Sequence, residues 1–125
     1  MTNEQEKVFN SILDSTKVSI GIPVEVTDFD VRIITDINAA FSVLTQLGVG
    51  SSRGFMITGK EDTYDDFLSE PIEQSLIRQY IINKVHVSFD PPSSTSLMET
   101  LKSQIDEAQF RLQVIWDEKN KKSRR

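Results

Sequence analysis

Residues 29–50 read FDVRIITDINAAFSVLTQLGVG, and this stretch decides the fold class that the sequence predicts. Its apolar residues recur every three or four positions, which is the period of one face of an α-helix. The acidic residues Asp28 and Asp30 suit the positive end of a helix, and either Thr27 or Asp28 is expected to cap it. Gly48 follows where a left-handed residue commonly ends a helix. The predicted helix runs from about residue 28 to residue 47, with an apolar stripe made by Val31, Ile34, Ile37, Phe41 and Leu44 and widened by Ile33, Ala40 and Leu47.

The stretch GVGSSRGFMITGKEDTYDDF at residues 48–67 opens with three glycines in seven residues. A phosphate-binding loop would need G-x-G-x-x-G after a strand, or Gly-Lys followed by Ser or Thr. The spacing here is G-x-G-x-x-x-G after a helix, so we interpret Gly48 as a helix cap, and Gly50 and Gly54 as bends. Phe55–Ile57 is then a candidate for a short strand, and Thr63 is expected to cap a short helix.

Two long helices are expected in the second half of the chain. Pro71 fits the first turn of one, and Asp90-Pro91-Pro92 would stop it. The next helix has caps available at residues 93–95. It carries apolar residues in alternating steps of three and four, the spacing that a long helix needs to lie along a partner. These residues are Met98, Leu101, Ile105, Ala108, Leu112 and Ile115.

The N-terminal part is less regular. Residues 3–14 show one apolar stripe and are expected to form a helix, whereas residues 17–30 are rich in β-branched side chains and are expected to be extended or a loop. The predicted fold is therefore mainly α: a small bundle of about four to five helices, two of them long, with a short β-strand or hairpin loop.

The composition limits the classes of protein to which the chain can belong. The chain has 125 residues, which fits one domain, and its lack of cysteine excludes disulfides and thiolate metal sites. No apolar run approaches the roughly 20 residues that a membrane span needs. The N-terminus also lacks the layout of a secretory signal. We therefore expect a soluble protein that is made in the cytoplasm and has no membrane partner.

Charge is distributed unevenly. The last seven residues, KNKKSRR, hold five of the 14 basic residues, whereas residues 1–118 carry a net charge of −10. We expect a single helical domain at residues 1–118 and a basic tail at residues 119–125. Such a tail either seeks an anionic surface or is a frayed, solvated end, and the acidic body argues against nonspecific binding of duplex DNA by the whole domain.

Few residues suggest a catalytic or metal-binding role. The chain has one histidine, His86, within a predicted helix, where a structural role is more common than a catalytic one. An acidic cluster at residues 61–66 lacks the spacing of a calcium loop, so helix capping and solvated charge explain it better than a cation site. We predict no catalytic residue, no metal and no cofactor.

The order of these segments resembles the head–tail connector (adaptor, or head-completion) proteins of long-tailed bacteriophages. The similarity covers about residues 9–116. Tyr64 and Phe110 stand where many relatives carry tryptophan, and both keep an aromatic ring. The segments that carry the resemblance are FNSILDSTKVSIGI, FDVRIITDINAAFSVLTQLGVG, GFMI, TYDDF, IRQYIINKVHVSFDPP and IDEAQFRLQ.

This resemblance implies a structural virion protein without catalysis, located in the neck at the head–tail interface. It implies a homo-oligomeric ring, usually dodecameric, beneath the portal protein. The ring would extend the channel for passing duplex DNA, without sequence recognition, and would carry the next stopper or tail protein.

Within this family, two sets of residues are expected to make contacts between subunits. The loop after the glycines is expected to form an arm on a neighbouring subunit, although it would also fit as a loop folded on its own core. The C-terminal helix and basic tail are expected to meet the portal or DNA. The arm set is Arg53, Phe55, Ile57, Tyr64, Asp65 and Phe67, and the portal set is Phe110, Arg111, Trp116, Lys119, Lys121, Lys122, Arg124 and Arg125.

Two other functions compete with the connector. One is a small DNA-binding or regulatory helical protein that uses its basic tail, which would bind duplex DNA tightly and in a salt-sensitive manner. The other is a phage enzyme or nuclease built on the acidic cluster, whose metal-dependent activity would depend on Asp65 and Asp66.

Overall fold

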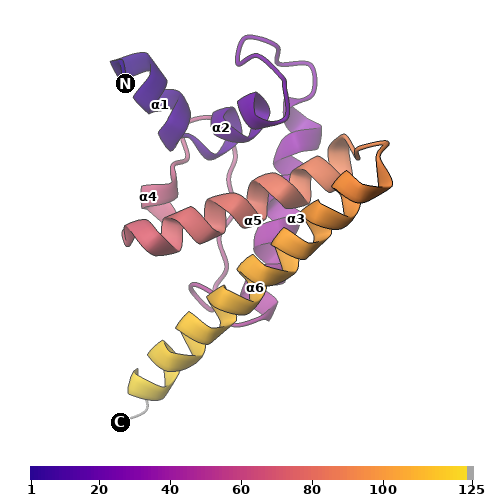
Figure 1. Ribbon diagram of the computed structural model, residues 1–125. Helices are drawn as coiled ribbons and strands as arrows, with labels where there is room; N and C mark the ends of the chain where they lie inside the picture. Colours follow the sequence, from indigo (N-terminus) through magenta and orange to yellow (C-terminus); the bar gives the residue numbers. More distant parts are fainter. Residues whose placement is uncertain (124–125) are drawn as a thin grey trace.

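The computed structural model describes residues 1–123 and is mainly helical, as the sequence predicts (Figure 1). Helix α5 packs against both α3 and α6, so it lies at the centre of the bundle. The short helices α1, α2 and α4 lie around this three-helix centre (Figure 1). The helices are α1 (Asn3–Asn10), α2 (Ile12–Ser19), α3 (Asp30–Gln46), α4 (Tyr64–Phe67), α5 (Pro71–Phe89) and α6 (Thr95–Ser123).

The N-terminal region forms two helices, so the prediction of one helix over residues 3–14 is wrong. The break falls at Ser11, whose extended backbone forms an isolated antiparallel bridge with Thr63. The amide of Ile12 also donates to the carbonyl of Asp62 at 3.0 Å. Ser11 then caps α2 by accepting from the amide of Asp14, and α2 continues to Ser19, into the segment expected to be extended. A contact distant in sequence therefore overrides a continuous helical pattern.

Helix α3 contributes one buried face to the core. The predicted stripe is largely buried, but Val31 is 81% exposed because it lies in the first turn, beyond the edge of the core. The predicted caps are also wrong, since the helix begins after Phe29 and no side chain caps it. The buried residues of the helix are Ile33, Ile37, Ala40, Phe41 and Leu44.

The glycines end α3 as predicted. Gly48, Gly50 and Gly54 all have φ values between +82° and +83°, a region that residues with a Cβ atom rarely adopt. The amide of Val49 donates to the carbonyl of Leu44 at 2.9 Å, which closes a left-handed helix end. A Cβ atom at Gly50 would lie 2.9 Å from the ring of Phe67, so glycine also allows the following segment to return onto α3.

Helices α5 and α6 form an antiparallel pair. Pro71 begins α5, and Ser94 caps α6 by accepting from the amide of Leu97. A side-chain hydrogen bond between Asn83 and Gln104 joins the two helices near their connection. The spacing of the last helix predicts a partner along which it packs. In the structure, this partner is α5 of the same chain. The side chains of α6 buried at this contact are Leu101, Ile105, Ala108, Leu112 and Trp116.

Candidate assembly surfaces

The segment that follows α3, residues 48–68, is defined here as the arm, and it packs on its own chain. Ile57 and Tyr64 are 1% and 2% exposed, so both lie in the core. Phe55 and Phe67 are half-buried, and their ring centroids lie 5.1 Å and 5.0 Å from that of Phe41 on α3. These four arm side chains fix the position of the arm in the monomer, and their role in contacts between subunits stays a prediction.

A hydrogen-bonded clamp holds the middle of the arm. The side-chain oxygen of Asn38 on α3 accepts from the amide of Ile57 at 2.8 Å, and its nitrogen donates to the carbonyl of Ile57 at 3.0 Å. The predicted strand and hairpin are not confirmed, since residues 1–123 contain no β-strand. Asn38 satisfies the backbone of Ile57 as a neighbouring strand would. The only sequence signal was a polar amide within an apolar helix.

Replacing Asn38 with alanine is expected to lower the free energy of unfolding by about 2 kcal/mol, because it leaves two half-buried backbone groups without partners. Urea denaturation measures this loss. Asn83→Ala is the matched control, since Asn83 makes a single bond to another side chain and should cost less than about 1 kcal/mol. An equal loss in the two variants would show that the clamp does not hold the arm.

The acidic cluster of the arm caps local structure. Asp62 accepts from the backbone amides of Thr58 and Gly59, and Asp66 forms a reciprocal capping pair with Thr63. Asp65 accepts from the side chain of Gln74 at 2.6 Å. Within residues 1–123, no three His, Cys, Asp or Glu side chains gather closely enough to hold a metal ion.

The arm leaves a few side chains in solvent. Met56 is 70% exposed, and Arg53 and Asp65 are the other exposed members of the predicted arm set. A shallow groove of about 460 Å³ lies between α3 and the arm, with Arg53 and Met56 among its lining residues. The parts of the arm available to a neighbouring molecule are therefore mostly polar, with Met56 as the exposed apolar anchor.

The residues of the portal set on α6 differ in their exposure. Phe110 is 67% exposed and Arg111 is exposed, whereas Trp116 packs against the bundle and is only 8% exposed. Lys119 lies over the Trp116 ring at 4.2 Å and pairs with Glu73 on α5 at 2.7 Å. The first residues of the basic tail therefore continue α6.

The remaining basic side chains lie at the end of the same helix. Lys121 lies 3.8 Å from Glu118, and Lys122 is exposed. Arg124 and Arg125 lie outside the described residues.

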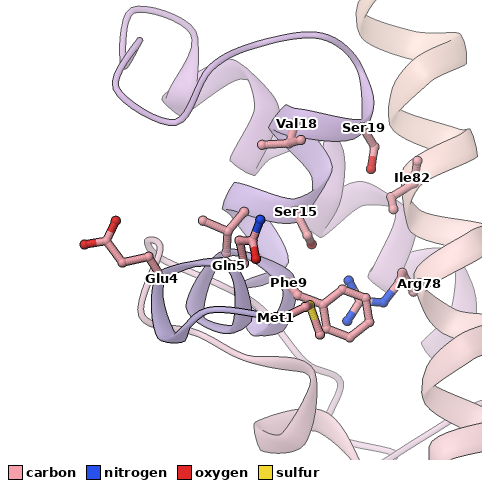
Figure 2. Close-up of a pocket in the computed structure, with 10 residues that line it drawn as sticks. Met1, Glu4, Gln5, Phe9, Ser15, Val18, Ser19, Arg78 and Ile82 are labelled. Atoms are coloured by element: carbon pink, nitrogen blue, oxygen red, sulfur yellow. The ribbon is translucent and has the colours of Figure 1, made fainter.

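A groove that the sequence did not predict lies between α1, α2 and α5, with a volume of about 570 Å³ (Figure 2). The guanidinium of Arg78 lies between two aromatic rings, 3.9 Å from the centroid of Phe9 and 4.4 Å from that of Tyr64. Burial lowers the pKa of Arg78 and raises the pKa of Tyr64 to about 12. The hydroxyls of Ser15 and Thr16 lie beside the phenol, and both donate to backbone carbonyls. The Tyr64 hydroxyl itself has no hydrogen bond of good geometry.

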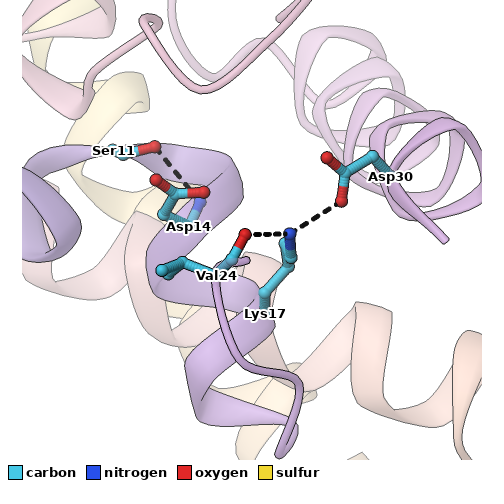
Figure 3. A network of polar contacts seen from close by, with 5 residues as sticks. All are labelled: Ser11, Asp14, Lys17, Val24 and Asp30. Carbon is cyan, nitrogen blue, oxygen red and sulfur yellow. Dashed lines mark hydrogen bonds and ion pairs between the residues drawn. The ribbon is translucent and has the colours of Figure 1, made fainter. Parts of the chain in front are cut away.

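Another side of α2 carries a buried charge (Figure 3). Lys17 is 1% exposed, and its Nζ lies 2.8 Å from Oδ1 of Asp30 at the start of α3. The same Nζ donates to the carbonyl of Val24 at 3.0 Å. Beside it, partial burial raises the pKa of Asp14, and the positive charge of Lys17 opposes that rise. This network joins α2, the loop at residues 20–29 and α3, and so positions one wall of the groove.

In the described part of the chain, no helix is both long and apolar enough to cross a membrane.

Comparison with known proteins identifies the family. No curated protein and no solved structure matches the chain. The family model described as phage connector protein matches residues 12–119, which include every helix from α2 to α5 and most of α6. The chain therefore belongs to the phage connector protein family and is a head–tail connector of a bacteriophage virion.

Proposed function

We propose that the protein forms a ring beneath the portal vertex, extends the channel through which DNA passes, and provides the surface on which the next neck or tail protein docks. The match to the phage connector family over residues 12–119 carries this proposal. A closed ring needs two different, complementary faces on each subunit. Two unlike surfaces are available on this chain: the groove between α1, α2 and α5, and the exposed side of α6.

The charge of the chain suits a channel. Residues 1–118 have a net charge of −10, and carboxylates repel the phosphates of DNA, so a wall of this composition would let a duplex slide without being held. In the ring, the basic end of α6, including Lys121 and Lys122, would face acidic groups of the portal. The exposed arm residues Arg53, Met56 and Asp65 would contact a neighbouring subunit at the rim of the bundle.

Removing the gene from the phage is expected to give heads that contain DNA but carry no tails, and to abolish infectious particles. Electron microscopy of the lysate and plaque counts measure this result, and supplying the gene in trans is the control. Cryo-imaging of wild-type necks should then place this chain between the portal and the tail. Tailed, infectious particles that lack the chain would contradict the proposal.

A further inference from the structure

The groove between α1, α2 and α5 contains an arginine without an acidic partner. Within residues 1–123, Arg78 makes ring contacts with Phe9 and Tyr64 but no hydrogen bond or ion pair. A guanidinium has five N–H donors, and leaving them unmet in a half-buried position is unfavourable. An occupant that brought a carboxylate to Arg78 would satisfy these donors.

The walls of this groove are apolar and accessible. Phe9 and Val18 are 47% and 52% exposed, although both are hydrophobic, and Ile82 lines the same space. Figure 2 shows Phe9 and Arg78 facing each other, whereas the carboxylate of Glu4 points away from them. Glu4 is the single acidic residue among the described residues that line the groove. The groove is therefore suited to an apolar segment that also carries negative charge.

The exposed side of α6 has these properties. Phe110 and Val114 are one helical turn apart and are 67% and 46% exposed. With 3.6 residues per turn, Glu107 and Asp117 lie on the same side of the helix, opposite the side that packs on α5. Neither of these two acids forms an ion pair with residues 1–123. We define Glu107, Phe110, Val114 and Asp117 as the α6 stripe.

We propose that the α6 stripe of one copy docks in the groove between α1, α2 and α5 of the next copy. Apolar side chains at a spacing of four residues would enter an apolar groove, and the flanking carboxylates would reach Arg78. The stripe faces away from α5 in its own chain, so it meets the groove only on another copy. The contact is head-to-tail, which is the geometry that builds rings.

This inference rests on the proposed ring and specifies its subunit contact. It assigns Phe110 to the neighbouring subunit and leaves the basic end of α6 for the portal. The partner is a second copy because one chain carries both halves of a complementary pair, an unpaired cation in an apolar groove and an acid-flanked apolar stripe.

Disulfide cross-linking tests the contact directly, because the chain has no cysteine of its own. The double variant Val18→Cys with Val114→Cys places one thiol in the groove and one on the stripe. Mild oxidation of assembled necks, and of the concentrated purified protein, is expected to give a ladder of dimers, trimers and larger species on a denaturing gel. Either single variant is expected to remain monomeric, because a head-to-tail contact does not bring two identical positions together.

The matched control is Val31→Cys with Val114→Cys, since Val31 is 81% exposed but lies outside the groove, and it should give no ladder. Necks that contain the chain but give no ladder from the groove–stripe pair would overturn the contact and leave the connector function intact. A cross-link from Val18→Cys to another neck protein, without a ladder, would also overturn it. If the chain is absent from necks, the proposed connector function is contradicted. The contact is then tested only by whether the purified protein gives the ladder.

A third substitution tests the role of charge. Adding Arg78→Glu to the groove–stripe pair would place a carboxylate opposite the acids of the stripe. The yield of ladder is expected to fall by about tenfold or more, which corresponds to a change of about 1.4 kcal/mol in the contact. Circular dichroism checks that this variant is folded. An unchanged yield from a folded variant would overturn the pairing of Arg78 with the stripe.

Discussion

Replacing Phe41 with alanine is expected to lower the free energy of unfolding by about 4 kcal/mol, the largest effect of any single substitution considered. Phe41 is 1% exposed, and its ring makes edge contacts with both Phe55 and Phe67. Truncation removes the ring from the core, leaves a cavity, and takes away the surface on which the arm folds. Urea denaturation measures the loss, and hydrogen exchange should show faster exchange at the amides of residues 48–68.

Two variants calibrate this result. Phe41→Leu keeps most of the volume and should cost less than about 1.5 kcal/mol. Phe110→Ala removes the same ring from a side chain that is 67% exposed, and should change the free energy of unfolding by less than about 0.5 kcal/mol. If Phe41→Ala cost no more than Phe110→Ala, the ring cluster would not be what holds the arm against α3.

Replacing Lys17 with methionine is expected to lower the free energy of unfolding by about 3 kcal/mol, because it leaves the carboxylate of Asp30 without its counter-ion and the carbonyl of Val24 without its donor. The value is near the lower end for a broken buried pair, since Asp30 keeps 25% of its side chain exposed. The loop at residues 20–29 should also become more mobile, because Lys17 joins it to α2. Chemical denaturation and hydrogen exchange measure the two effects.

A double-mutant cycle separates the pair from the rest of the network. Asp30→Asn removes the charge that Lys17→Met leaves unpaired, so the double variant should lose less than the sum of the two single variants. Arg32→Met is the surface control. Its partner Asp36 lies 3.8 Å away and the arginine is 62% exposed, so the change should be below about 1 kcal/mol. Strict additivity in the cycle would show that Lys17 and Asp30 do not stabilise each other.

Much of the fold was predictable because its signals are local. The period of α3, the left-handed glycine at residue 48 and the proline that begins α5 each depend on a few neighbouring residues, and the structure confirms all three. Errors arose where distant segments meet. Thr63 interrupts the N-terminal helix at Ser11, and Asn38 on α3 satisfies the segment expected to be a strand.

The candidate surfaces were less predictable for the same reason. The exposed stripe on α6 follows from helical period, once it is known which side of α6 packs on another helix. The groove does not, because it combines Phe9 from α1, Val18 from α2 and Arg78 from α5, which are far apart in the sequence. No pattern in one segment marks Arg78 as a cation without an acidic partner, since that depends on which side chains surround it.

The sequence by itself determined the helical class, the C-terminal end of α3, both ends of α5, the absence of cysteine chemistry and the family resemblance. These depend on composition and on interactions within one or two turns of a helix. Only the tertiary structure decided that α6 lies along α5 of its own chain, that the arm aromatics pack on Phe41, and that a cation remains unpaired in a groove. Each of these depends on close packing between segments distant in sequence, because the burial of a side chain is set by all of its neighbours together.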